Sequence, residues 1–223
     1  TPVTGSITTY AAPLRLGTNG GYLQMLNGTL DECRIYSRAL SSQEVHELYD
    51  GLHAWYKFNE DSGTVAAEAS VGGNNGAING ATWTAGKNGG GLGFDGVDDY
   101  VEAPDSPSLN ITNEITVSAW VYYVENNKYQ MIISKPYLSN SNTSPYASYS
   151  LYISSAGVPG LWMTIEGVGR NLSSSEALSN GTWNHIVGTY DGSMMKIYIN
   201  GQLKGSTPVT GSITTYAAPL RLG

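Results

Sequence analysis

Acidic side chains are the first residues to test for chemistry, because glycosidic bonds are hydrolysed by paired carboxylates. The two groups lie about 5 to 5.5 Å apart in retaining enzymes and roughly 6.5 to 9.5 Å apart in inverting ones. On a strand this requires acids two positions apart, which share a face. Glu166 stands alone in its apolar run, and Asp98 and Asp99 are adjacent, so they point to opposite faces if the chain is extended. No Ser-His-Asp arrangement is indicated either. We therefore predict that the protein is not an enzyme.

Acidic loops could instead bind calcium, which prefers carboxylate and carbonyl oxygens. The loop FDGVDDY, residues 94–100, is the most acidic stretch of this kind. Its acids lack the alternating spacing of a dedicated calcium loop. The sequence therefore predicts a hairpin turn here rather than a metal site.

Tyrosines flank an unusually polar insertion at residues 139–144. These are Tyr129, Tyr137, Tyr146 and Tyr149. Sugar rings stack on exposed aromatic faces while polar loops bind their hydroxyls, so this stretch is a candidate glycan site. The alternative is that these tyrosines alternate along strands, with hydroxyls that reach the surface.

The composition favours strands joined by polar turns. Apolar residues make up 40% and charged residues 13% of the 223, with 28 Gly and 16 Tyr. The net charge of −7 offers phosphate backbones no basic patch, so we predict no nucleic-acid partner.

No apolar run approaches the roughly 20 residues of a membrane span, and no signal peptide is recognisable, although an export signal could lie outside this sequence. Cys33, the one cysteine, is predicted to be a small buried residue.

Short β-rich runs and turn signals cover most of the chain. The signals include Asn75-Gly76, Asp191-Gly192 and Asn200-Gly201. Many short strands with regular turns predict an antiparallel sandwich. The runs are residues 14–16, 30–36, 53–58, 93–94, 100–102, 116–124, 130–134, 148–153, 160–166, 185–190 and 196–199. One short surface helix is expected at residues 41–49, where Ser41 and Glu44 form a capping box.

The order of these pieces resembles the laminin-G-like, concanavalin A-like jelly-roll domains. The family's opening is matched by residues 53–83, 91–111 and 114–123, and its late section by residues 183–206 and 218–223. Its closing strand and helix are matched by GTLDECRIYSRALSSQEVHELYDG, residues 28–51, which here precede the opening. The resemblance implies an all-β, antiparallel two-sheet jelly-roll sandwich in an extracellular or cell-surface protein.

The resemblance also implies a structural calcium ion. Its ligands would be Asp31 on the closing strand and carbonyl oxygens near Lys57 and Gly91. Asp31 shares a strand face with Cys33, so a buried carboxylate there needs a cation or hydrogen bonds. The alternative is an ordinary hydrogen-bonded aspartate in a turn. Three tryptophans match framework positions of the family and are expected in the core: Trp55, Trp120 and Trp183.

The segment TPVTGSITTYAAPLRLG occurs twice, at residues 1–17 and 207–223, a period of 206 residues. We therefore divide the chain near Gly51: residues 1–51 supply the end of one domain, and residues 52–223 supply the beginning of the same or the next one. A tandem array of near-identical domains, a circular permutant and strand exchange between subunits all fit. If residues 1–51 fold back onto residues 52–206, the copy at residues 207–223 is spare and apt to pair with another chain.

These observations predict a non-catalytic extracellular structural or adhesive repeat module. It would be part of a tandem array or of a filament linked through the doubled segment, and its partners would be copies of itself. The alternative is a carbohydrate-binding module of a secreted glycan-active enzyme; glycans or cell-surface proteins are further possible partners. Sequons for glycosylation, which a chain rich in Asn, Ser and Thr also contains by chance, occur at Asn27, Asn110, Asn142, Asn171 and Asn180.

Overall fold

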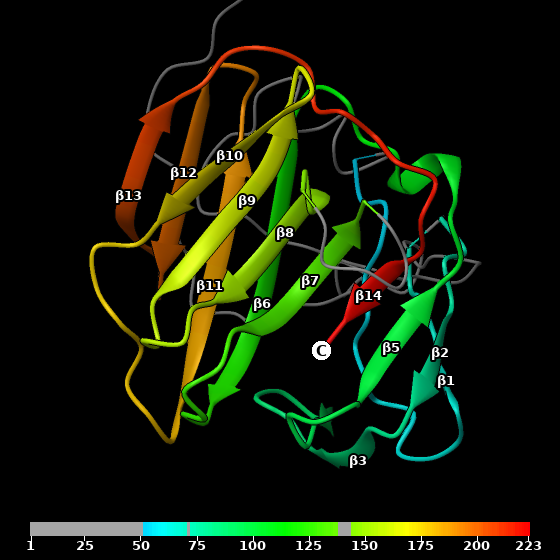
Figure 1. Cartoon of the computed structure of the whole chain (residues 1–223). Coiled ribbons are helices and arrows are strands. Elements are labelled where there is room, and N and C mark those ends of the chain that lie inside the picture. The colour runs from blue at the N-terminus through cyan, green and yellow to red at the C-terminus, as the bar shows by residue number, and fades with distance from the viewer. Residues whose placement is uncertain (1–50, 71, 138–143) are drawn as a thin grey trace, which may run out of the picture. The chain divides into compact units, whose positions relative to one another are not determined.

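The computed structural model describes residues 51–70, 72–137 and 144–223. Two antiparallel sheets of eight and four strands dominate this part of the chain, and a two-stranded ribbon accompanies them. In Figure 1 strands β7 to β10 of the larger sheet lie in front of β6, β11 and β12, and β13 lies at the left edge. The prediction of an all-β, antiparallel two-sheet sandwich is confirmed.

The strands follow the chain in this order: β1 (Val65–Ala66), β2 (Gly76–Asn79), β3 (Thr82–Ala85), β4 (Gly90–Gly93), β5 (Tyr100–Ala103), β6 (Ile115–Tyr123), β7 (Gln130–Pro136), β8 (Ala147–Ile153), β9 (Pro159–Ile165), β10 (Val168–Ser173), β11 (Thr182–Tyr190), β12 (Met194–Ile199), β13 (Gln202–Pro208) and β14 (Leu220–Leu222). A short 3-10 helix, η1 (Pro107–Leu109), follows β5. The helix predicted at residues 41–49 lies outside the described residues.

The eight-stranded sheet has the order β1-β2-β5-β14-β7-β8-β9-β10. Its last strand in sequence, β14, is therefore an internal strand, and Figure 1 shows it between β5 and β7. Leu220 and Leu222 pair with Ala103 and Val101 of β5, and Leu222 also pairs with Ile133 of β7. An internal strand has its backbone groups bonded on both sides, so β14 is integral to the sheet.

The four-stranded sheet has the order β13-β12-β11-β6. Its hairpin between β11 and β12 is shaped by Asp191, whose Oδ1 accepts hydrogen bonds from the Ser193 amide and hydroxyl at 3.1 and 2.8 Å. The next hairpin turns at Asn200 and Gly201, both with positive φ (51° and 79°), as a tight Asn-Gly turn requires. Both turns were predicted from the sequence.

The core lies between these two sheets. Leu151, Leu161, Ile186 and Ile197 are fully buried, the first two on the larger sheet and the others on the smaller one. Alternation along each strand supplies these side chains, because successive residues face opposite sides. Gly188 fits this interior closely: a Cβ there would lie 2.7 Å from Leu161 Cδ1.

Most predicted strands are present, but residues 53–58 are not one of them. Within the described ranges this run makes only an isolated bridge, between Tyr56 and Glu68. An alternating pattern predicts a strand only where a partner strand pairs with it, and these residues lack a continuous one among the described residues. Gly76 also differs from its prediction as a turn, since it begins β2 and packs against Val101.

The second copy of the doubled segment is built into the sandwich. Besides forming β14, it buries Ile213, whose amide donates to the Thr112 carbonyl at 2.7 Å, and its Gly211 carbonyl accepts from the Tyr190 hydroxyl at 2.7 Å. In the described part of the chain this copy therefore fills a position inside the sheet. The first copy, residues 1–17, lies outside the described residues.

Candidate functional site

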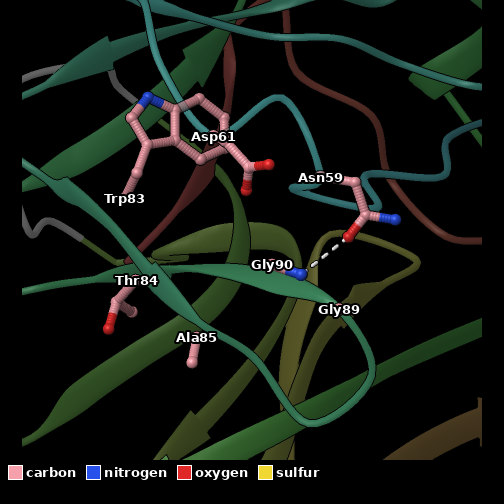
Figure 2. Close-up of a pocket in the computed structure, with 7 residues that line it drawn as sticks. All are labelled: Asn59, Asp61, Trp83, Thr84, Ala85, Gly89 and Gly90. Carbon is pink, nitrogen blue, oxygen red and sulfur yellow. Dashed lines mark hydrogen bonds between the residues drawn. The ribbon is translucent and has the colours of Figure 1, made fainter.

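A hollow of about 440 Å³ lies between the turn at residues 59–61 and the β3–β4 ribbon (Figure 2). The Trp83 indole nitrogen donates to the Gly63 carbonyl at 2.9 Å, which fixes the ring at one side. The Gly90 amide donates to Asn59 Oδ1 at 2.8 Å, which ties the turn to the ribbon. The lining residues are Asn59, Asp61, Trp83, Thr84, Ala85, Gly89 and Gly90.

Oxygen atoms gather around Gly90 at this hollow. A Cβ there would overlap the Phe58 carbonyl oxygen and would lie 3.3 Å from Asp61 Oδ1. Phe58 and Asp61 have positive φ values of 52° and 59°, so the turn that presents these oxygens is an unusual one. The buried Oε2 of Glu60, between them in sequence, has no hydrogen-bond partner among the described residues. The Phe58 carbonyl and the Asp61 carboxylate at Gly90 thus form a cradle of oxygen donors, the ligand type that calcium prefers.

Two of the residues predicted near the metal flank this cradle. The Lys57 ammonium lies 4.0 Å from the centroid of the Trp55 ring, so it is the backbone of this residue that adjoins Phe58. Gly91 pairs with Thr84 in the β3–β4 ribbon. Asp31 lies outside the described residues.

Exposed Tyr146 packs against Trp162 of β9 with ring centroids 5.1 Å apart and an edge-to-face angle of 79°. The Trp162 indole nitrogen donates to the Pro145 carbonyl at 2.9 Å. Gly169 of β10 leaves the space that the Trp162 ring occupies, because a Cβ there would overlap it. The pair is thus a supported aromatic surface, and in the sequence Tyr146 closely follows the polar insertion at residues 139–144.

Two further tyrosine contacts involve the predicted residues. Tyr129, 63% exposed, lies 5.7 Å from the Tyr152 ring, whose hydroxyl donates to Asn171 Oδ1 at 2.8 Å. Tyr137 contacts Tyr216 of the doubled segment, with ring centroids 4.7 Å apart. In each contact one tyrosine lies near the surface, and hydrogen bonds to neighbouring residues position the other.

Tyr149 differs from the other three tyrosines because it lies in the core. It is 2% exposed, and its hydroxyl donates to the Leu109 carbonyl at 3.1 Å. Burial, together with nearby Tyr56 and Asp105, raises the pKa of the Tyr149 hydroxyl well above its usual range. Its ring is therefore not available for stacking on a sugar.

The sequence reasoning missed an aromatic group on the outer face of the smaller sheet. Trp120 of β6 packs on His185 of β11 with ring centroids 5.0 Å apart, and Tyr122 meets Trp183 edge-on at 5.7 Å. Trp120 is 44% exposed and Trp183 lies on the same outer face, so the expected place of both in the core is wrong. Alternation could have shown this, because Val117 and Tyr123 face inward and Trp120 differs from both by an odd number of positions.

The remaining candidates have local structural roles. Asp95, Asp98 and Asp99 bring carboxylate oxygens within 4.8 Å of one another, because the chain turns there and is not extended. Asp95 Oδ1 accepts from the Val97 amide at 2.8 Å, as in a tight turn. Glu166 Oε1 accepts from the Ser212 amide at 2.6 Å and so holds the doubled segment.

The sequon asparagines are placed as follows. Asn110 Oδ1 is buried, Asn171 bonds Tyr152, and Asn180 Oδ1 accepts from the Glu125 amide at 3.0 Å. Asn27 and Asn142 lie outside the described residues.

The two packed antiparallel sheets define a jelly-roll β-sandwich. Residues 95–223, more than half of the chain, match the family model of the concanavalin A-like lectin/glucanases superfamily, laminin G type. The chain belongs to this family. Among the described residues, no helix has the length and apolar character needed to cross a membrane.

Two solved structures match with a TM-score above 0.5 and share the fold. Domain 4 of a GH43 extracellular arabinanase from Geobacillus stearothermophilus, in complex with arabinotriose, is 19% identical over 77% of this chain and 82% of that one, with a TM-score of 0.54. The binding domain of botulinum neurotoxin serotype G is 14% identical over 70% and 40%, with a TM-score of 0.53. An S-layer domain-containing protein from Clostridium thermocellum is 30% identical over 69% and 71%, with a TM-score of 0.45. No curated protein matches the chain.

Proposed function

We propose that the protein is a non-catalytic repeat module of an extracellular structural or adhesive protein, with successive copies in tandem. The observation that carries this proposal is the position of the doubled segment. Residues 207–223 supply an internal strand of the sandwich, and one sandwich has room for one such strand. Residues 1–17 have the same sequence and therefore correspond to the same strand of another module.

Repetition would serve adhesion directly. Modules in an array add reach, and a weak contact on each module is multiplied by avidity when several engage together. The family membership and the low proportion of charged residues agree with an extracellular location. In this arrangement the immediate partners are neighbouring copies of the same module.

The mass of the intact native protein under denaturing conditions tests the array. A mass many times the 23.7 kDa of this chain is expected. A mass near 23.7 kDa would overturn the covalent array, and strand exchange between subunits would then replace it.

A second candidate function is carbohydrate binding, favoured by the Tyr146–Trp162 pair, whose Tyr146 closely follows a polar insertion in the sequence. The arabinanase domain of similar fold was solved with arabinotriose. Stacking on an aromatic ring contributes much of the affinity for a sugar when polar groups orient it.

Affinity electrophoresis in gels containing arabinan or other polysaccharides tests this function. Tyr146→Ala should abolish the retardation, whereas Tyr122→Ala on the other sheet should not. Unchanged retardation of Tyr146→Ala would exclude this surface.

We further propose a structural calcium ion at the oxygen cradle. The Phe58 carbonyl and the Asp61 carboxylate are the described donors, and Asp31 is the donor expected from the closing segment. When bound, calcium would hold the turn at residues 58–61 against the β3–β4 ribbon. Isothermal titration with calcium chloride tests this, with Asp61→Asn expected to weaken binding and Glu114→Gln, at an exposed carboxylate outside both acidic groups, expected to leave it unchanged.

A further inference from the structure

β14 fills a position that is closely defined by its two neighbouring strands. This position is a slot between β5 and β7, continued by the path of residues 209–219 across the sandwich. Side chains from both sheets line it. Ala218 and Leu220 are buried, and Ile213 is 2% exposed and bridges Ile165.

Polar contacts fix the register of the segment in this slot. The Lys135 ammonium donates to the Ala218 carbonyl at 2.6 Å, and the Tyr216 amide donates to Ser148 Oγ at 3.1 Å. Arg221 donates to Glu102 at 2.9 Å through Nε. A shift by one residue would turn Leu220 and Leu222 away from the core and break these bonds, so the slot selects one sequence in one register.

The chain carries two copies of that sequence. Each slot-filling residue of residues 207–223 has an identical counterpart 206 positions earlier: Ile7 for Ile213, and Leu14 for Leu220. The first copy can therefore make every contact that the second copy makes. We propose that the chain's own residues 1–17 are a second occupant of the β14 slot and replace residues 207–223 when that copy is weakened or displaced.

As the occupant of the β14 slot, residues 1–17 of the same chain are favoured over residues 1–17 of another molecule. Residues 18–51 join this copy covalently to the sandwich, and a covalent connection raises its effective concentration at the slot above that of micromolar protein in solution. The second copy is continuous with β13, so it fills the slot first. For its biological use the inference rests on the proposed repeat architecture, because there it would let neighbouring modules exchange strands.

Hydrogen exchange of the whole chain, read by mass spectrometry, tests the exchange of copies. Identical peptides cannot be told apart, so each variant also serves as a mass label. Thr210→Ser changes an exposed residue and should leave the second copy in the slot. Ile213→Asp puts a charge at a buried position and should expel it.

In Thr210→Ser, residues 207–223 should be protected and residues 1–17 should exchange fast. In Ile213→Asp, protection should pass to residues 1–17, with the protein still monomeric by light scattering. The double variant Ile7→Asp, Ile213→Asp should protect neither copy and should melt about 10 °C below Ile213→Asp.

The proposal would be overturned if residues 1–17 were equally protected from hydrogen exchange in Thr210→Ser and Ile213→Asp. It would also be overturned by protection that appears only in oligomers, because the occupant would then come from another molecule. The native mass tests the array separately, so either proposal can fail without the other.

Discussion

Lys135 offers the sharpest test of whether the doubled segment is integral to the sandwich. Its side chain is fully buried on β7, and its ammonium group lies 2.6 Å from both Asp105 Oδ1 and the Ala218 carbonyl oxygen. Lys135→Met keeps most of the volume but removes both bonds. The Asp105 carboxylate is 36% exposed and can be hydrated again, whereas the buried Ala218 carbonyl loses a partner. An unsatisfied buried acceptor costs about 1–3 kcal/mol.

We therefore expect Lys135→Met to lower the free energy of unfolding by about 2 kcal/mol, and Lys135→Ala, which adds a cavity, by about 4 kcal/mol. Urea denaturation followed by tryptophan fluorescence measures both, and an unchanged m-value would indicate an unchanged denatured state. Lys196→Met is the matched control, because its ion pair with Asp191 is exposed and contributes less than about 0.5 kcal/mol. If Lys135→Met lowers the free energy of unfolding by no more than this control does, Lys135 does not anchor the doubled segment.

Three further predictions concern a turn, the core and the cradle. Hydrogen bonds from the Ser193 hydroxyl, and then from Lys196, hold the pKa of Asp191 below its usual range, so its stabilising effect is present above about pH 3.9 and is lost as the pH falls further. Asp191→Asn should lower the free energy of unfolding by about 0.5 kcal/mol at pH 7. This difference between wild type and variant should shrink below about pH 3.9 in acid denaturation. A difference that stays constant with pH would contradict the stabilising role of the ionised carboxylate. Gly188→Ala should cost about 1–3 kcal/mol in urea because its Cβ overlaps Leu161, and a neutral result would contradict the close packing. Chelation with EDTA should lower the melting temperature of the wild type but not of Asp61→Asn, and an equal fall in both would exclude this carboxylate as a ligand.

Strands with one buried face were predictable from the sequence. In β6 apolar residues alternate with polar or aromatic ones, and this period of two is enough to locate the strand and its inner face. The edge strand β10 was missed because VGRNLS has one buried apolar residue and no alternation. The strand predicted at residues 53–58 has the pattern but depends on a partner, and a pattern within one segment cannot report what pairs with it.

The candidate sugar site was predictable only in part, for the same reason. Tyr149 shares a strand face with buried Leu151 and Ile153, so register assigns it to the core. Tyr146 lies before β8 and has a φ of 69°, so strand alternation does not determine where its ring points. Its contact with Trp162 depends on β9 pairing with β8, which is a long-range feature. The oxygen cradle likewise joins residues 58–61 to Gly90 across some 30 positions of sequence.

Identity between the two copies of the doubled segment extends beyond what packing requires. Ile213, Leu220 and Leu222 are buried, and substitution there would disturb the slot. Thr210 and Ala217 are exposed, yet both are the same in the two copies. A slot that selected its occupant would keep the buried positions alike and let the exposed ones diverge. Identity at both kinds of position is instead what duplication of a whole module produces, since it copies every residue regardless of burial. The doubled segment therefore favours tandem modules of nearly the same sequence, in which interchangeable strands follow from duplication without separate selection for exchange.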